Sequence, residues 1–288
     1  MHTYHAWGIR RCGSHAIIGW ILHNIGSPYV HFNDIQDPHD PLTPGGVNVS
    51  GVPMWRYKRG LLRKIRYRYL ARDRSSFAGA DASLDYEGLA AIRNLNCRVF
   101  SYEDKFFAAA DDTCGGGVPG DVCKSILVLR DPFNLCASLL RSGYFSRGLD
   151  ELPALYCNHA EAFLRGDRAH VVGLNYNQWV RDRAYRISAA RRLGFETDGS
   201  PYDSIPANGG GSSFSGQSYS GKASQMNLFG RWHPMVASEE FCRLVCAPQV
   251  HEVAMTIFPA LASEVYDAIP RRFSQRRGSS ARHHAKGS

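Results

Sequence analysis

Short apolar runs alternate with amphipathic segments along most of this chain. Patterns typical of buried strands occur at residues 6–9, 29–32, 97–101, 125–129 and 170–174. Helical spacing of apolar residues occurs between these runs, around residues 15–25, 86–94, 133–141, 152–165, 178–193 and 238–257. Strands that alternate with helices predict an α/β fold, in which a mostly parallel central sheet carries helices on both faces.

The chain has 288 residues, which fits a single α/β domain over residues 1–270. Residues 37–60 are rich in Pro and Gly, and residues 199–224 in Gly and Ser, so both are predicted to be loops. The formal net charge is +8, but much of it lies in residues 271–288, which we expect to be a disordered basic tail. The remaining body is only about +2, so a nucleic-acid partner is not expected.

Eight cysteines are scattered along the chain without a CxxC pair. We therefore expect reduced, mostly buried thiols and no zinc site. The first residues lack the basic segment and apolar run of a signal peptide. No apolar stretch approaches the roughly 20 residues of a spanning helix. These patterns predict a cytoplasmic protein without a membrane span.

The turn between the first strand and the first helix has the features of a phosphate-binding loop. Its residues are Arg10, Arg11, Cys12, Gly13, Ser14, His15 and Ala16. A helix N-terminus offers unpaired N–H groups and a partial positive charge to an anion, and Arg11 and Ser14 add a fixed charge and a hydroxyl. This opening predicts a three-layer architecture like that of P-loop NTPases, although the GxxxxGK[ST] motif is absent. The alternative is a capped helix with two incidental arginines.

A second constellation begins where the clearest strand, residues 125–129, ends. Arg130 leaves the edge of the sheet at which open α/β folds bind ligands. Ser138 lies eight residues further on, just over two helical turns, so both side chains can face one crevice. An arginine beside a hydroxyl suits a phosphate monoester. The alternative is that Arg130 pairs with Asp131 at the strand end.

These constellations, in this order, resemble those of the sulfotransferases that use 3′-phosphoadenosine 5′-phosphosulfate (PAPS). In that family a basic residue, a small residue, Gly and Ser/Thr grip the 5′-phosphosulfate, and RCGSH at residues 11–15 is similar. A later strand that ends in Arg, with Ser eight residues on, grips the 3′-phosphate, and LRDPFNLCAS at residues 129–138 resembles it. The resemblance covers about residues 5–260 and implies no metal.

Two further segments extend the resemblance. LNYNQW…RRLGF at residues 174–195 implies that Tyr176 lies near the adenine. The stretch from residue 209 to residue 232 looks like the C-terminal loop that closes on the nucleotide. The implied cofactor-binding residues are Arg10, Arg11, Cys12, Gly13, Ser14, His15, Ala16, Arg130, Ser138, Tyr176, Ser212, Ser213, Phe214 and Arg231.

The resemblance also implies catalytic roles. Arg11 stands where many members have Lys; it can stabilise charge on the bridging oxygen but cannot give up a proton. The family's base is His or Glu, and the strand register puts Glu103 at that place. Asp34 is the main rival, followed by His31, and His15 can donate to the sulfuryl group.

The sequence therefore predicts an enzyme that transfers the sulfuryl group of PAPS to a hydroxyl or amine and releases adenosine 3′,5′-bisphosphate. The expected acceptor is a glycan or a small molecule, and the sequence does not identify it further. The basic segment at residues 61–74 would suit an anionic acceptor, although such runs are most often a solvated face. Two alternatives stay open: a P-loop kinase-like phosphotransferase that uses ATP, with Asp104 or Asp131 for Mg²⁺, and a non-catalytic nucleotide-binding module.

Overall fold

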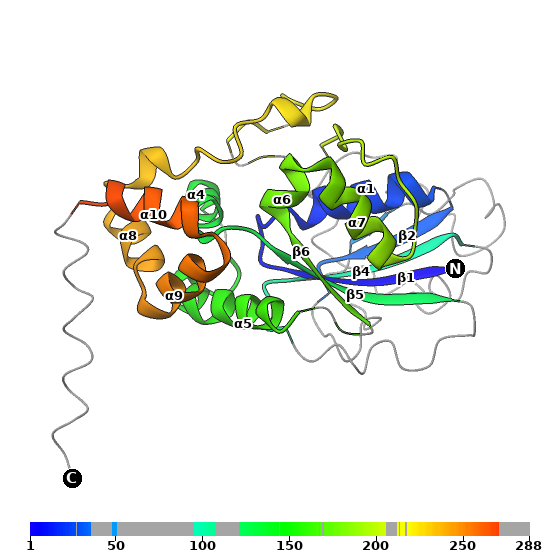
Figure 1. The fold of residues 1–288 in the computed structure, drawn as a ribbon, viewed down its shortest axis with the longest axis horizontal. Helices are drawn as coiled ribbons and strands as arrows, with labels where there is room; N and C mark the ends of the chain where they lie inside the picture. Colours follow the sequence, from blue (N-terminus) through cyan, green and yellow to red (C-terminus); the bar gives the residue numbers. More distant parts are fainter. Residues whose placement is uncertain are drawn as a thin grey trace, which may run out of the picture.

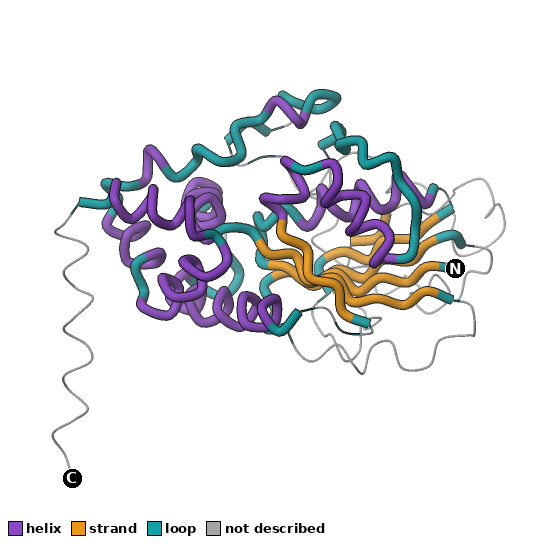
Figure 2. The backbone as a smooth tube through the Cα atoms, in the orientation of Figure 1, coloured by secondary structure: helices purple, strands orange, loops and turns teal. Residues whose placement is uncertain are grey.

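The computed structural model describes residues 1–35, 48–50, 95–107, 121–205 and 212–270, apart from residues 27, 144, 167, 169, 213 and 217. Within these residues the chain forms a sheet flanked by helices (Figures 1 and 2). Four predicted segments lie outside the described residues: most of the loop at residues 37–60, the basic segment at residues 61–74, the helix at residues 86–94 and the tail at residues 271–288.

Five strands of the sheet are parallel, which confirms the predicted fold class. In spatial order they are β2 (Tyr29–Asn33), β4 (Cys97–Glu103), β1 (His2–Gly8), β5 (Val122–Leu129) and β6 (Val171–Asn175). A short antiparallel strand, β3 (Asn48–Ser50), pairs with the outer edge of β2. The sequence predicted a loop at β3, because a three-residue edge strand is defined by its partner and has too few residues for a pattern of its own.

Both faces of the sheet are buried, as the apolar strand runs indicate. Successive side chains of β1 alternate between two clusters, because a strand has a period of two residues. Tyr4 and Ala6 belong to the cluster that includes α1 (Ser14–Ile25). Trp7 belongs to the cluster on the other face, with Phe32 and Tyr102.

Helices α1, α6 (Tyr176–Arg181) and α7 (Arg183–Leu193) lie together on one side of the sheet (Figure 1). Helix α5 (Leu152–Leu164) contacts β5 and places Ala162 in the cluster of the other face. The helix predicted at residues 178–193 begins earlier and is broken. Asp182 ends α6 and caps α7, accepting the backbone N–H groups of Ala184 and Tyr185.

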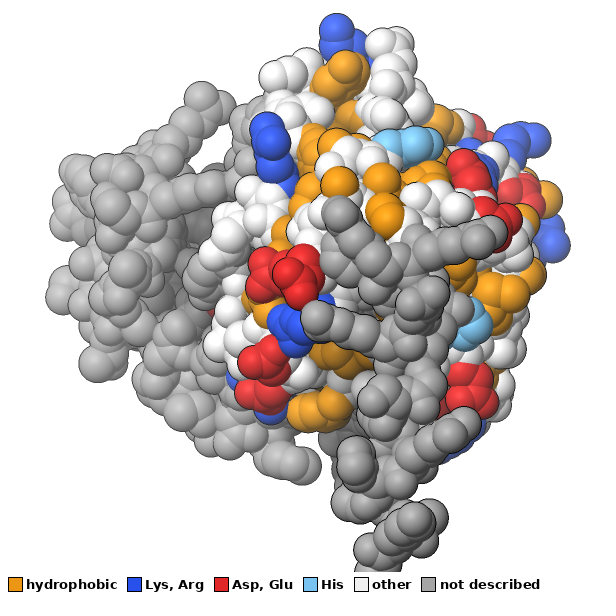
Figure 3. Space-filling view, turned by 90° about the vertical axis from the view of Figure 1, so that its left-hand side faces the viewer, with side chains coloured by type: hydrophobic (Ala, Val, Ile, Leu, Met, Phe, Trp, Pro, Cys, Tyr) orange, Lys and Arg blue, Asp and Glu red, His pale blue; other side chains and the backbone are white. Residues whose placement is uncertain are grey.

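A cluster of helices lies beyond the carboxyl ends of the strands (Figure 1). Its members are α4 (Pro132–Ser142), α8 (Glu239–Val245), α9 (Pro248–Ile257) and α10 (Pro259–Ala268). The sequence predicted one helical region at residues 238–257 and missed α10; prolines at the starts of α9 and α10 divide the region. Acidic and basic side chains are intermixed over the coloured part of this end (Figure 3).

The structure bears on two expectations about the whole chain, namely the state of its cysteines and whether a helix could span a membrane. Cys123 is disulfide-bonded, so the expectation of reduced thiols is wrong at this residue. Six other cysteines in the described part are free. No helix among the described residues is long and apolar enough to cross a membrane.

Candidate functional site

The loop between β1 and α1 presents backbone donors at the start of the helix. Gly13 is the N-cap of α1 with a φ of 97°, and a Cβ at this position would lie 2.2 Å from the ring of Tyr176. Only glycine fits there. The N–H groups of Gly13 and His15 have no acceptor among the described residues. These unpaired donors at a helix N-terminus suit an anion.

Other residues of this loop make contacts within the protein. The Cys12 thiol is buried, which raises its pKa to about 12, and Ser14 hydrogen-bonds to it. The N–H of Ala16 donates to the carbonyl oxygen of Gly13 at 3.0 Å. Arg11 has a φ of 71°, a left-handed conformation that is uncommon for a residue with a side chain.

Arg130 lies directly after β5, where the sequence predicted an anion-binding residue. Its Nη1 donates to the carbonyl oxygen of Arg11 at 3.1 Å and lies 3.5 Å from Ser138 Oγ. Its Nη2 donates to the carbonyl oxygen of Leu228 at 2.7 Å. The structure thus brings Arg130 and Ser138 together and joins them to the first loop.

The alternative pairing of Arg130 with Asp131 does not occur. Asp131 caps α4: its Oδ1 accepts the backbone N–H of Asn134 at 2.7 Å, and its Oδ2 accepts Nδ2 of Asn177 at 2.8 Å. Two neutral amides therefore satisfy this buried carboxylate. Sequence reasoning missed Asn134, whose Oδ1 also accepts the N–H of Arg231 at 2.9 Å. Its only sequence signal is its place three residues after a helix cap.

Arg231 comes from the segment after the last strand and meets the same serine. Its Nη1 donates to Ser138 Oγ at 3.0 Å, and its Nη2 donates to Ser212 Oγ at 2.9 Å. The ring of Phe214 lies 5.0 Å from this guanidinium. Ser138, Ser212, Phe214 and Arg231 were all predicted from sequence, and the structure brings them together. Ser213 lies outside the described residues.

The guanidinium groups of Arg130 and Arg231 lie together in a buried site. Arg130 is 2% exposed and Arg231 is 6% exposed. Among the described residues neither forms an ion pair with a carboxylate, and their partners are hydroxyl and carbonyl oxygens. Burial, and then the charge of Arg130, lower the pKa of Arg231 to about 10. Like charges in a medium of low dielectric constant repel strongly, so an anion bound here would stabilise both.

Tyr176 lies between the start of α1 and Arg130. Its ring covers Gly13 on one side and lies 5.4 Å from the guanidinium carbon of Arg130. It also stacks on Trp179, with 5.9 Å between the ring centroids. Asn175 caps α6 and so fixes the start of the helix that carries this ring. Tyr176 therefore sets the spacing between the loop and Arg130.

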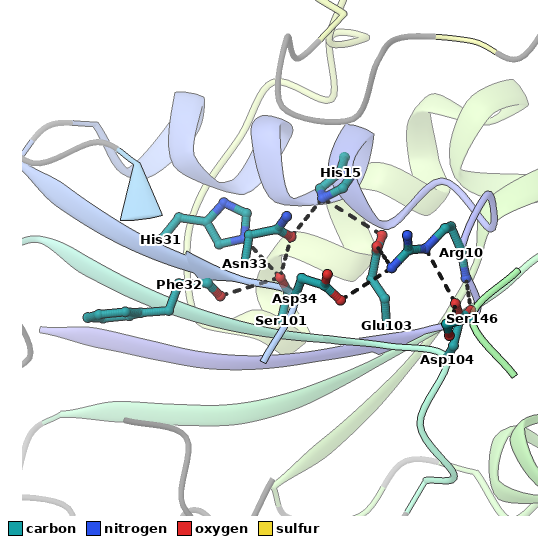
Figure 4. A network of polar contacts seen from close by, with 10 residues as sticks. All are labelled: Arg10, His15, His31, Phe32, Asn33, Asp34, Ser101, Glu103, Asp104 and Ser146. Atoms are coloured by element: carbon teal, nitrogen blue, oxygen red, sulfur yellow. Dashed lines mark hydrogen bonds and ion pairs between the residues drawn. The ribbon is translucent and has the colours of Figure 1, made fainter. Parts of the chain in front are cut away.

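A network of carboxylates lies beside the loop, at the ends of β1, β2 and β4 (Figure 4). Its centre is Arg10, whose Nη2 lies 3.1 Å from Glu103 Oε2 and 3.2 Å from Asp34 Oδ1. The Nε of Arg10 lies 3.3 Å from Asp104 Oδ2, and its backbone N–H donates to Asp104 Oδ1 at 2.7 Å. The side chain of Arg10, predicted to bind the cofactor, is thus directed to three carboxylates.

His15 connects the loop to this network (Figure 4). Its Nε2 lies 2.8 Å from Asn33 Oδ1 and 3.8 Å from Glu103 Oε1. Glu103, the predicted base, and Asp34, its rival, therefore share one cluster with His15. Asn33 was not predicted as a site residue, and Asp104 was named only as a Mg²⁺ ligand of the alternative phosphotransferase, because only the strand order brings both residues here.

His31 lies further from the loop. Its Nε2 is 3.0 Å from Ser101 Oγ, which donates to Asn33 Oδ1 at 2.8 Å. The side chain is buried, and this burial, followed by the nearby His15, lowers the pKa of His31 to about 3. His31 is therefore neutral near pH 7, and its ring meets the ring of His15 edge to face, with 6.3 Å between the ring centroids.

No model of a known protein family matches this chain, and it has no significant match among curated proteins.

Proposed function

We propose that the chain is a sulfotransferase that uses PAPS as its sulfuryl donor. The observation that carries the proposal is the pair of buried guanidinium groups, Arg130 and Arg231, that meet at Ser138 without a carboxylate partner among the described residues. This site suits a phosphate monoester. It is joined by the Arg130–Arg11 hydrogen bond to a helix N-terminus that suits a second anion. A nucleotide with anionic groups on both the 3′ and 5′ sides would satisfy both positions.

The described residues divide between the two ends of such a nucleotide. Arg130, Arg231 and the hydroxyl groups of Ser138 and Ser212 would hold the 3′-phosphate. The N–H groups of the loop and the charge of Arg11 would hold the 5′-phosphosulfate. PAPS supplies an activated sulfuryl group, and the protein needs mainly to align the acceptor and stabilise developing charge.

The carboxylate network would accept the proton of the acceptor hydroxyl or amine. Glu103 is 8% exposed and is held by Arg10 on one oxygen and approached by His15 at the other. A carboxylate fixed in this way can act as a general base without reorganising. Asp34 shares Arg10 and is the rival for this role. Both lie at the same edge of the sheet as the loop, where an acceptor in line with the 5′ group would arrive.

The alternative of an ATP-dependent phosphotransferase gains no support from its candidate Mg²⁺ ligands. Asp131 accepts hydrogen bonds from Asn134 and Asn177. Asp104 is 1% exposed and contacts Arg10 and the hydroxyl of Ser146. Both carboxylates are thus engaged with protein donors.

The acceptor class and the cytoplasmic location stay predictions. A disulfide at Cys123 is more typical of oxidising compartments than of the cytoplasm. The basic segment at residues 61–74, proposed to attract an anionic acceptor, lies outside the described residues.

Thermal unfolding with nucleotides tests the proposed function. Adenosine 3′,5′-bisphosphate should raise the Tm by mass action, whereas AMP and ATP with Mg²⁺ should raise it much less. Equal shifts from AMP would show that no 3′-phosphate site exists. Incubation with labelled PAPS and a panel of glycan, phenol and amine acceptors then identifies the substrate. Nucleotide binding without transfer to any acceptor would favour the non-catalytic module.

A further inference from the structure

Arg130 contacts the backbone of the first loop in addition to lying in the second anion site. Its Nη1 donates to the Arg11 carbonyl oxygen at 3.1 Å and lies 3.5 Å from Ser138 Oγ. Its Nε is buried and makes no hydrogen bond to any residue that the structure describes. One guanidinium therefore touches both ends of the site, and it keeps a buried donor that a ligand can satisfy.

The loop needs such a support. Arg11, whose carbonyl Arg130 holds, has a φ of 71°, which is disfavoured for a residue with a Cβ. Residues persist in such conformations only where their surroundings fix them. A charged, buried donor on the carbonyl oxygen supplies one restraint. The ring of Tyr176, packed on Gly13, supplies a second restraint two residues further on.

We propose that Arg130 is a positioning residue for the first loop as well as a ligand of the 3′-phosphate. It holds the Arg11 peptide in the conformation in which the loop presents its N–H groups to the 5′ end of the nucleotide. The inference rests on the proposed function for the identity of that nucleotide. Its consequence is that a change at Arg130 weakens binding at an end of the nucleotide that Arg130 does not touch.

Adenosine 5′-phosphosulfate separates the two roles because it lacks the 3′-phosphate. The Arg130→Lys variant keeps the charge but loses the planar fork that reaches several acceptors at once. We expect it to bind adenosine 5′-phosphosulfate about tenfold more weakly than the wild type in isothermal titration calorimetry. Ser138→Ala is the matched control. This variant removes the neighbouring hydroxyl and leaves the contact between Arg130 and Arg11. It should weaken the binding of adenosine 3′,5′-bisphosphate but change the Kd of adenosine 5′-phosphosulfate by less than about twofold.

Equal affinities of wild type and Arg130→Lys for adenosine 5′-phosphosulfate would overturn the positioning role. A wild-type protein that binds neither nucleotide would overturn the proposed function instead. Circular dichroism checks the fold of each variant. If Arg130→Lys does not fold, or the wild type binds adenosine 5′-phosphosulfate too weakly to measure, hydrogen exchange of the wild type decides. Binding of 3′-AMP should alter amide exchange at residues 9–15, relative to adenosine; unchanged exchange there would contradict the inference.

Discussion

Arg231 Nη1 donates to Ser138 Oγ at 3.0 Å, although 93 residues separate them in the chain. Ser138 belongs to α4, which follows β5, whereas Arg231 belongs to the segment between α7 and α8. The same hydroxyl lies 3.5 Å from Arg130. The group of Arg130, Ser138 and Arg231, which we propose as the 3′-phosphate site, is therefore formed only when these two parts of the chain meet.

Replacing Arg231 should weaken nucleotide binding selectively at the 3′ end. Arg231→Ala removes one of two charged donors from a buried phosphate site, so the binding free energy of adenosine 3′,5′-bisphosphate should fall by about 2–4 kcal/mol. AMP affinity should change much less. Arg243→Ala is the control, since Arg243 forms an exposed ion pair with Asp150. Isothermal titration calorimetry measures the affinity of the wild type and of both variants for each nucleotide. If Arg231→Ala binds the bisphosphate normally, the 3′-phosphate does not bind at Arg231.

Replacing Glu103 should abolish proton transfer while preserving nucleotide binding. Glu103→Gln keeps the shape of the side chain but cannot accept a proton, so turnover at saturating PAPS should fall by about 10²–10⁴-fold. The ascending limb of the pH–rate profile should disappear as well. Asp34→Asn is the matched comparison, because Asp34 contacts the same arginine. If Asp34→Asn is inactive while Glu103→Gln turns over normally, the base belongs to β2 and the assignment to β4 is wrong.

Replacing Arg10 should destabilise the protein more than replacing a partly exposed arginine at the surface. Arg10→Met leaves the buried carboxylates of Glu103 and Asp104 without their shared cation, which should lower the free energy of unfolding by about 3 kcal/mol. Arg147→Met breaks an exposed pair with Glu151 and should cost less than about 1 kcal/mol. Urea unfolding at pH 7 compares the two variants. Similar losses would mean that the three carboxylates do not depend on Arg10.

Three buried histidines should make the protein sensitive to mild acid. Burial lowers the pKa of His5 and of His159 to about 4 and that of His31 to about 3. Below about pH 6.5 the unfolded chain binds protons at these residues and the folded chain does not, so the free energy of unfolding falls as the pH falls. Each contribution is complete above about pH 6.5 and is lost toward the pKa of that histidine in the folded protein, at about 1 kcal/mol per pH unit.

Urea unfolding between pH 7 and pH 4.5 measures this slope. His5→Gln should make it shallower, because one group that takes up protons on unfolding is gone. His23→Gln, at an exposed position of α1, should leave it unchanged. If the slope is the same in all three proteins, folding does not lower the pKa of His5.

The sequence predicted the proximity of two site residues where both lie in one short stretch of the chain. Arg130 and Ser138 lie eight residues apart on one strand and helix, and their proximity follows from helix geometry. The clustering of Arg10 with Asp34 and Glu103 could not be predicted in the same way. It depends on β4 lying between β1 and β2, and neighbours that are not consecutive in the chain leave no local pattern. For the same reason Arg10 was assigned to the cofactor, together with its loop neighbours.

The late position of Arg231 and Ser212 in the chain has a consequence for synthesis on the ribosome. The last strand that the structure describes ends at Asn175, and Ser212 and Arg231 follow it. A nascent chain can therefore contain every described strand before it contains these two residues. Under the proposed function, the complete 3′-phosphate site exists only in chains translated beyond residue 231, so nucleotide bound there would retain those chains selectively.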